Sequence, residues 1–384
     1  MKHLYLPAGI GILLAIGFVA GRISSTQGNN TAVGEKRNEL GKNRHTSVRG
    51  QDERPSDRTR SGKLRQAIRS ARSDEIKALA KQAISTGDSV VRMALFNEIL
   101  GRMDAENFLQ LTAVPGELSA ETGRDNRSEW FMLHVRAGQV AGEEAMEAIG
   151  AQNGWRSEKI GSVMRGWAMT DPATALVWLE SQKNMAAADR ASLVTFLTAG
   201  AVFHDEAGAK TLLAGLTESE RTQCVPGFVP ALIQQSGKEG ALAWLQEVKS
   251  SAPKSPFETA ATQKVFDHFL TNGANQWDAA AMVKEMEALS KVIPLHDDWF
   301  SRGMGRVLYN SPTGGINYLN EIAKNPTLSE IPMSDWMYDN AVRRCLSQDR
   351  SALDAWIAKH PDSPAMEKFA AAQERVSRTM GITR

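Results

Sequence analysis

The chain has 384 residues, of which 42% are hydrophobic and 23% are charged, which is typical of a globular protein with a large buried core. Its formal net charge of +1 gives no indication of a nucleic-acid-binding protein or of a strongly acidic partner. The two cysteines, Cys224 and Cys345, are too few for a disulfide framework or a Cys-based zinc site.

The N-terminal segment 1–22 differs from the rest of the chain in being strongly apolar. Residues 4–21 form an uncharged run of 18 residues that ends at Arg22. A helix needs about 20 apolar residues to span a bilayer, so this segment is just long enough. We expect a single-pass signal anchor, and the alternative is a signal peptide cleaved after Val19-Ala20-Gly21.

The location expected from this segment is the cell membrane, or secretion if the leader is cleaved. Lys and Arg are more numerous on the C-terminal side of the run, which argues against export of that side. Long domains, however, cross membranes largely regardless of charge. We therefore expect the bulk of the chain to be periplasmic or otherwise extracytoplasmic.

Residues 23–61 are predicted to be a disordered basic linker. The stretch has almost no large apolar side chains and cannot bury enough surface to offset the entropy cost of ordering. From Arg22 to Lys63 there are ten Lys or Arg and five Asp or Glu, a net charge of +5. A solvated tether is the favoured interpretation, and contact with anionic lipid or an acidic polymer is the alternative.

Residues 62–384 are predicted to be a single helical repeat domain, and the pattern is clearest at Asp171. Asp is a favoured N-cap, and Pro172 stands at the first helical position, where proline is common. Ala175, Trp178 and Leu179 follow at offsets +4, +7 and +8, which is one face of an α-helix. Asp171 is therefore expected to start a helix with an inner face of Ala, Trp and Leu.

The same spacing recurs eight times, at intervals of 37, 30, 34, 32, 38, 36 and 38 residues, which average 35. A period of about 35 residues is the length of a two-helix hairpin with its turns. The expected helix starts are Asp104, Ala141, Asp171, Asp205, Gly237, Asn275, Ser311 and Asp349. The residues taken as the signature of the repeat are Asp171, Pro172, Ala175, Trp178, Asp205, Ala241, Trp244, Tyr318, Asp349 and Trp356.

The small residue at +4 and the aromatic residue at +7 have a predicted role in packing. A small side chain at +4 allows the two helices of a hairpin to approach closely, and the ring one turn later fills the space between hairpins. We therefore expect Trp167 and Trp178 to pack across their hairpin, with Asp171 acting as a helix cap and not as a catalytic carboxylate.

An array of helical hairpins of about 35 residues resembles the α-solenoid class, which includes the tetratricopeptide, Sel1-like and HEAT families. The pattern W-x3-D-P-x2-A-x2-W-L at residues 167–179 is similar to repeats of uncharacterised membrane-anchored or secreted bacterial proteins. The units do not consistently supply the Leu-Gly and Tyr of tetratricopeptide repeats. The resemblance implies an all-α fold, a right-handed superhelix of about eight hairpins after one N-terminal apolar helix and the linker.

A linear array has a consequence for the two cysteines. Cys224 and Cys345 are 121 residues apart, about three units, and stacked helices are spaced by about 8–10 Å. Their Cα atoms should then lie beyond the roughly 7 Å limit for a disulfide. We predict two thiols that are not joined.

Histidine and carboxylate clusters are the remaining candidates for chemistry. His204-Asp205-Glu206 and His296-Asp297-Asp298 could supply metal ligands or an acid–base pair, but neither has the His-x3-His spacing that puts two ligands on one helix face. Both lie near predicted helix starts, where acidic residues stabilise the helix dipole. We predict capping or surface roles for both, a packed or half-exposed His268, and no metal or cofactor.

The favoured hypothesis is a membrane-tethered or exported protein-interaction scaffold without catalytic activity. Its expected partner is a protein or peptide on the concave face, with the membrane contacted through residues 4–21, and no nucleic acid. The alternative is a glycan-binding or peptidoglycan-active envelope enzyme built on a helical superhelix. Its candidate carboxylate is Glu129 beside Trp130, and Trp299 next to Arg302 could stack on a sugar or base, although a core or interface role is favoured.

Overall fold

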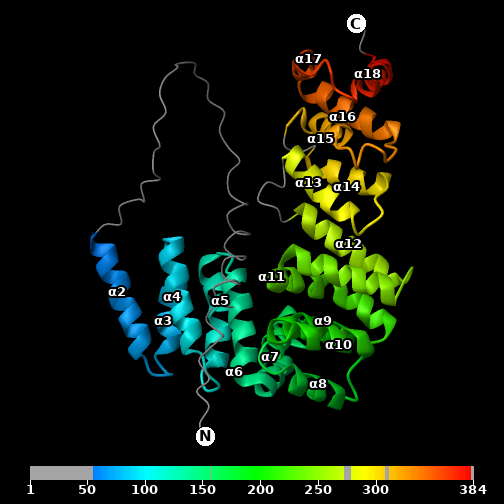
Figure 1. Ribbon diagram of the computed structural model, residues 1–384. Helices are drawn as coiled ribbons and strands as arrows, with labels where there is room; N and C mark the ends of the chain where they lie inside the picture. The colour runs from blue at the N-terminus through cyan, green and yellow to red at the C-terminus, as the bar shows by residue number, and fades with distance from the viewer. Residues whose placement is uncertain (1–54, 156, 272–277, 308–310, 382–384) are drawn as a thin grey trace. The chain divides into compact units, whose positions relative to one another are not determined.

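The computed structural model describes residues 55–155, 157–271, 278–307 and 311–381 (Figure 1). Over these residues the chain forms 17 helices and no strand, which confirms the all-α prediction. The predicted anchor at 4–21 and most of the predicted linker lie outside the described residues. The first described helix begins at Pro55, inside the range predicted as linker. The chain divides into two compact units, 1–212 and 213–384.

In unit 1, helices that are close in sequence pack together. From α2 to α9 the helices contact helices one or two places along the chain, as α3 does with α4 and α5, and α7 with α6, α8 and α9. Figure 1 shows this order from α2 (blue) to α6 (green-cyan). The helices are α2 (Pro55–Ser70), α3 (Ile76–Ile84), α4 (Ser89–Arg102), α5 (Phe108–Thr122), α6 (Arg127–Asn153), α7 (Glu158–Ala168), α8 (Pro172–Ser181), α9 (Ala187–His204) and α10 (Glu206–Gly215).

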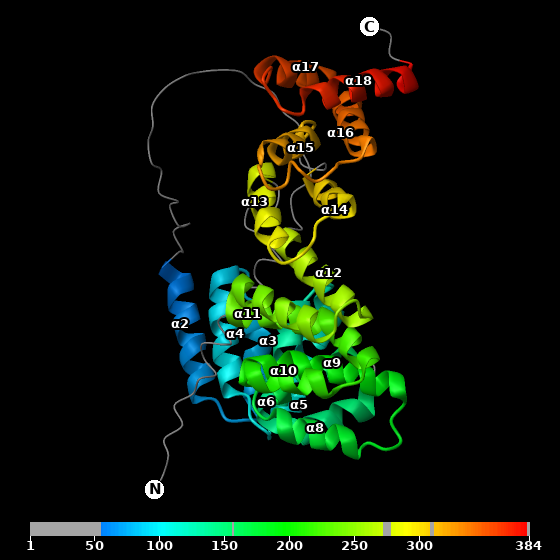
Figure 2. The same ribbon diagram turned by 45° about the vertical axis from the view of Figure 1, so that its right-hand side comes forward.

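Unit 2 follows the same rule of neighbour packing. Here α11 contacts α12, α15 contacts α13, α14 and α16, and α16 contacts α17 and α18. Figure 2 shows the sequence from α12 through α15 to α18 (red). The helices are α11 (Glu218–Ser251), α12 (Pro256–Thr271), α13 (Ala279–Ser290), α14 (Asp297–Val307), α15 (Gly314–Lys324), α16 (Asp335–Gln348), α17 (Arg350–Lys359) and α18 (Met366–Met380).

Three of the predicted helix starts are aspartate caps, and the structure confirms all three. Asp171 accepts a hydrogen bond from the Thr174 N–H at 3.0 Å, and Pro172 is the first residue of α8. Asp205 accepts from the Ala207 and Gly208 N–H groups in the first turn of α10, and Asp349 accepts from the Ala352 N–H at the start of α17. Each carboxylate satisfies N–H groups that have no partner within the helix.

Two further starts are marked by glycine with left-handed backbone. The long helix α11 is broken at Gly237, where φ is 71°, as predicted for that position. The long helix α6 is broken at Gly142, with φ of 43°, one residue beyond the predicted Ala141. Only glycine adopts such a φ at little cost, so the hairpin turn settles on Gly142 and not on its alanine neighbour.

Of the other three predicted starts, two differ from the structure. After Asp104 a turn intervenes, in which its carboxylate accepts from Asn107 N–H, and α5 begins only at Phe108. The start predicted at Ser311 is displaced to Thr313, because residues 312–313 form a turn. Asn275 lies outside the described residues. The cap of α13 is Asp278, whose carboxylate accepts from the Ala281 N–H.

The small and aromatic positions of the repeat lie in the core, as predicted. Ala175, Ala241, Trp178, Trp244, Trp356 and Tyr318 are all buried. The rings of Trp167 and Trp178 lie 5.9 Å apart between centroids, which confirms the predicted packing across that hairpin. In unit 2 the corresponding residue, Trp244, contacts both its own hairpin and the next helix. Its ring centroid lies 5.2 Å from that of Phe228 on α11 and 6.1 Å from that of Phe257 on α12.

Helices α6, α7 and α9 pack at backbone distance because glycines line their contacts. A methyl group added at Gly138 would lie 2.0 Å from the carbonyl oxygen of Val163 on α7. At Gly166 it would lie 1.8 Å from the carbonyl oxygen of Val135 on α6, and at Gly200 it would lie 2.3 Å from a carbonyl oxygen of α7. No side chain larger than hydrogen fits these positions without moving a helix.

Cys224 and Cys345 are both buried and are not joined by a disulfide, as the array predicted. Burial raises the pKa of the Cys345 thiol to about 11, helped by the charges of Asp349 and Asp354. This cysteine therefore stays protonated at neutral pH and acts as a small apolar side chain in the core.

Candidate functional site

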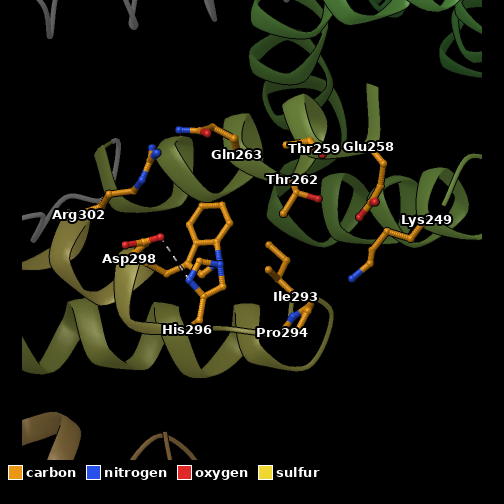
Figure 3. Close-up of a pocket in the computed structure, with 11 residues that line it drawn as sticks. Lys249, Glu258, Thr259, Thr262, Gln263, Ile293, Pro294, His296, Asp298 and Arg302 are labelled. Atoms are coloured by element: carbon orange, nitrogen blue, oxygen red, sulfur yellow. Dashed lines mark ion pairs between the residues drawn. The ribbon is translucent and has the colours of Figure 1, made fainter. Parts of the chain in front are cut away.

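The candidate site is an open pocket in unit 2 with a volume of about 310 Å³ (Figure 3). Four segments form its walls: the end of α11, one face of α12, the loop before α14 and the first turns of α14. A pocket of this size is at the lower end of the range for small-ligand sites. Its lining residues are Lys249, Glu258, Thr259, Thr262, Gln263, Ile293, Pro294, His296, Asp298, Trp299 and Arg302.

Helix α12 presents a polar wall because of how it begins. The Glu258 N–H donates to the Ser255 hydroxyl at 3.0 Å, and the Glu258 carboxylate accepts from the Lys254 N–H at 2.9 Å. The sequence pattern here is that of a capping box, but the returning bond reaches Lys254 instead of the cap residue. Glu258 is thereby oriented at the rim, and Thr262 lies one turn further along the same helix face.

The opposite wall is aromatic and comes from the start of α14. The ring of the half-buried Trp299 packs on Phe266 at 4.3 Å between centroids and lies 5.7 Å from the His296 ring. The guanidinium of Arg302 is 5.6 Å from the Trp299 ring, a cation–π contact. Arg302 also pairs with Asp267 at 3.7 Å. Phe266 and Arg302 therefore hold the Trp299 ring in position, and part of the ring surface lines the pocket.

Two polar groups in the pocket wall differ in how they are satisfied. The Lys249 ammonium donates to the carbonyl oxygen of Val292 at 2.8 Å, which ties the end of α11 to the end of α13. The Thr262 hydroxyl is buried and has no hydrogen-bond partner, with only 8% of the residue exposed. Figure 3 shows this hydroxyl on the side of Thr262 that faces Glu258 and Lys249. An unmet buried hydroxyl costs free energy unless a partner arrives.

The pocket is built for binding more than for chemistry. It combines an aromatic surface, an apolar floor of Ile293 and Pro294, and side chains of both charges. His296 Nδ1 and Asp298 Oδ2 are 3.8 Å apart and both side chains are exposed, so the pair is not held in a proton-transfer geometry. Among the described residues no cluster of three or more His, Cys, Asp or Glu side chains has the geometry of a metal site.

The histidine and carboxylate clusters predicted from the sequence have the expected surface or capping positions. His204 ends α9, and the two residues after it begin α10, where Glu206 pairs with Lys210. In the second cluster, Asp297 accepts from the Ser334 N–H at 3.2 Å and so ties α14 to the start of α16. His268 is half-buried, as expected, and burial lowers its pKa to about 4.

Glu129, the carboxylate considered for an enzyme, does not line the pocket. It is buried on α6 and pairs with Arg92 at 3.4 Å. Its neighbour Trp130 packs on His134 at 4.5 Å between ring centroids. Of the sequence candidates, Trp299 and Arg302 line the pocket together with His296 and Asp298 of the second cluster, whereas Phe300 is buried in the core.

Sequence reasoning did not find Lys249, Thr262 or Gln263 as site residues. They occupy ordinary positions on helices, and nothing in their spacing distinguishes them from other polar residues. The capping pattern at Ser255–Glu258 marks the start of α12 but gives no indication that this helix forms a pocket wall. The pocket forms because four separate segments converge in the folded protein, and no local sequence motif indicates that convergence.

The predicted membrane anchor at 4–21 lies outside the described residues, so only the described helices can be compared with the requirements of a membrane span. None of them has both the length and the apolar character that a bilayer crossing requires. Comparisons with protein-family models, with curated proteins and with solved structures found no match to this chain.

Proposed function

We propose that this protein is an interaction scaffold in which each unit is a row of helical hairpins and a polypeptide partner binds the face formed by consecutive first helices. The observation that carries the proposal is the sequence separation of the residues joined by its tertiary hydrogen bonds. Side chains on separate helices join residues that are one hairpin length apart. The proposal includes the eight predicted hairpins, their right-handed winding and the tether to a membrane.

In unit 1 these bonds run between successive hairpins. Lys77 and Lys81 each pair with a glutamate 40 residues further on. The Arg136 guanidinium donates at 3.2 Å to the carbonyl oxygen of Leu100, 36 residues earlier. Such a cation at a helix C-terminus stabilises carbonyl groups that have no partner within the helix.

In unit 2, different residue types form side-chain bonds across a similar sequence separation. The Trp356 indole N–H donates to Asn317 at 2.6 Å across 39 residues. Arg375 pairs with Asp339 at 2.7 Å across 36 residues. A chain in which each hairpin is held mainly by its neighbours has an extended surface, and proteins of this type usually bind other proteins with it.

Site-specific photo-crosslinking tests the proposal. A benzophenone amino acid is placed at exposed Arg343 on α16, the first helix of its hairpin, or at exposed Asp354 on α17, the second. In unit 1, Gln139 on α6 and exposed Val177 on α8 form a second matched pair. We expect the same partner to be captured from Arg343 and Gln139 and not from Asp354 and Val177.

Capture of no polypeptide from any of the four positions would contradict the scaffold. Equal capture from first and second helices would contradict the assignment of the binding face. The cross-linking is done in cells that produce the full chain, so that the membrane tether, if present, is retained.

The pocket favours one other function, recognition of a saccharide. The half-buried Trp299 ring stands beside Glu258 and Asp298, and an aromatic face with carboxylates suits the apolar face and hydroxyl groups of a sugar. Titration of the full chain with cell-wall oligosaccharides should then quench tryptophan fluorescence. Trp299→Ala should abolish the effect, and Trp336→Ala, which removes a tryptophan 58% exposed on α16, should preserve it. Absent quenching, together with absent cleavage of the oligosaccharide, would eliminate this function.

A further inference from the structure

Arg165 on α7 is an arginine with unusual surroundings. Its guanidinium carbon lies 5.8 Å from the centre of the Phe131 ring on α6 and 5.4 Å from that of Phe203 on α9. The three residues therefore come from three successive first helices of unit 1. A guanidinium over an aromatic ring is stabilised by the ring quadrupole, and two rings restrict its orientation.

No protein group accepts a hydrogen bond from this guanidinium among the described residues. Its Nε–H is buried without a partner, and its described interactions are with the two rings. Burial lowers the pKa of Arg165, and no neighbouring carboxylate raises it. Arg136 on α6 differs, because it donates to the Leu100 carbonyl and to Gln139.

The backbone around Arg165 is held in place on both sides. Its own carbonyl oxygen would be 2.3 Å from a methyl group at Gly200 on α9, and the next residue, Gly166, lies against the Val135 carbonyl of α6. Since α6 and α9 both press on this turn of α7, the side chain starts from a fixed position. Binding to a group held in this way costs little ordering entropy.

We infer that Arg165 receives a carboxylate of the bound polypeptide, with the rings of Phe131 and Phe203 contacting the apolar atoms next to that carboxylate. The inference rests on the proposed scaffold function and names the chemistry of its partner. A guanidinium offers a planar fork that matches the two oxygens of a carboxylate. A partly desolvated cation without a counter-ion gains more from such a pairing than an exposed one.

A carboxylate fits the site better than a phosphate. Phosphate groups on proteins carry close to two negative charges and are usually met by clusters of arginines. Arg165 is a single cation flanked by phenyl rings, of which Phe203 is buried and Phe131 half-buried. A monoanion with an apolar stem, as in a glutamate side chain or a chain terminus, has both matching parts.

Nitrogen-detected NMR of the arginine side chains in the full chain tests the inference without knowledge of the partner. Propionate is the carboxylate probe, propionamide its neutral analogue, and inorganic phosphate the competing anion. We expect the Arg165 Nε–H signal to shift saturably with propionate, to stay in place with propionamide, and to need a higher concentration of phosphate. No shift with propionate, or tighter binding of phosphate, would overturn the inference.

Variants then connect the site to the partner. Arg165→Met keeps the length of the side chain beside the rings and should lower photo-crosslink capture from Gln139 by about tenfold or more. Arg165→Lys keeps the charge but loses the fork, and should give a smaller decrease. Arg350→Met removes the same charge from the exposed start of α17 and should have no effect.

These outcomes separate the inference from the function on which it rests. Capture that persists in Arg165→Met, with the same far-UV and near-UV circular dichroism as the native chain, would overturn the role of Arg165 and leave the scaffold intact. If Arg165→Met loses the native circular dichroism, the inference is tested by photo-crosslink capture in Arg165→Lys and by the propionate titration of the native chain.

Discussion

The hairpins around α7 in unit 1 and those around α12 in unit 2 share a spacing but are packed in different ways. In unit 1, glycines at 138, 166 and 200 bring α6, α7 and α9 together at backbone distance. In unit 2, the rings of Phe228, Trp244 and Phe257 fill the contact between α11 and α12. The repeat length is thus compatible with contacts between neighbouring helices through backbone and with contacts through aromatic rings.

The difference has consequences for the surface. Where α6, α7 and α9 touch through backbone there is no room for large side chains, and the feature that we propose as functional there is a single side chain, Arg165, between two aromatic rings. In unit 2, side chains from separate segments surround a pocket beside Trp299. We therefore expect the two regions to respond differently to substitutions of similar size.

The largest effect is expected from Trp244→Ala in unit 2. Trp244 is buried between two phenyl rings, so its removal should lower the free energy of unfolding by about 4 kcal/mol, because of lost burial and a residual cavity. Hydrogen exchange should show faster opening of α11 and α12 and unchanged protection of α16 to α18, since in the described parts of unit 2 the main contacts of each helix are with near neighbours in the chain.

The exposed Trp336→Ala is the control and should change stability by less than about 0.5 kcal/mol. Uniformly faster exchange throughout unit 2 in Trp244→Ala would contradict packing by neighbours and favour one cooperative core.

The second-largest loss of stability is expected from Gly166→Ala in unit 1. The added methyl group would lie 1.8 Å from the Val135 carbonyl oxygen, which belongs to a backbone that cannot rotate away. We expect a loss of about 3 kcal/mol in denaturant unfolding, near the upper end for overpacking. The matched variant is Gly116→Ala on α5, where nothing lies within 4 Å of the new methyl group. It should be neutral or stabilising, because alanine favours helix. Equal stability of both variants would show that α6 and α7 separate easily.

Acidification should destabilise unit 1 through His134. Burial lowers its pKa from 6.5 to about 4, and its Nδ1 lies 2.8 Å from the Trp130 carbonyl oxygen. The unfolded state binds the proton more readily, so stability is complete above pH 6.5 and decreases as the pH falls toward 4. At pH 5 the preference of the unfolded state for the proton on this histidine should lower the free energy of unfolding by on the order of 2 kcal/mol relative to neutral pH.

Urea unfolding of the full chain at pH 7 and at pH 5 measures this decrease. His134→Asn should show a smaller decrease between the two values, and the exposed His296→Gln should behave as the native chain. An unchanged pH dependence in His134→Asn would remove this histidine as the cause.

The smallest loss of stability is expected from substitutions at the helix caps, and both units use the same kind of aspartate cap. Asp171→Ala removes the acceptor of the Thr174 N–H and hydroxyl bonds and should cost about 1 kcal/mol. Those two bonds hold the pKa of Asp171 below its ordinary value, so the stabilisation should be lost as the pH falls. Asp349→Ala in unit 2 should act in the same direction. The exposed Asp354→Ala, within α17, caps nothing and serves as the control. A cap effect absent from both Asp171→Ala and Asp349→Ala would contradict the shared design of the hairpins.

Helix starts were predictable wherever a local interaction determines them. Asp171, Asp205 and Asp349 cap helices because a carboxylate one to three residues from an N–H group needs no tertiary partner. The prediction was displaced at Asp104 and Ser311, where a short turn precedes the helix and the sequence pattern of apolar residues continues through it. Register along a helix is local, whereas the length of a turn depends on what the turn packs against.

The candidate site was less predictable, for a related reason. Trp299 and Arg302 attracted attention as neighbours in the chain, but Lys249 and Thr262 belong to the pocket only because α11, α12 and α14 converge. Arg165 and its rings are separated by 34 and 38 residues along the chain, and their contact depends on the rotation of each helix about its own axis.

For this protein the amino-acid sequence by itself determined the helices, their aspartate caps, the glycine breaks and the spacing of about 35 residues, because each depends on groups within one or two turns of each other. The tertiary structure decided which neighbours touch through backbone and which through rings, and so where Arg165 and the Trp299 pocket arise. Those outcomes depend on the separation and rotation of helices, which are set by the combined packing of side chains from several hairpins and not by any one of them.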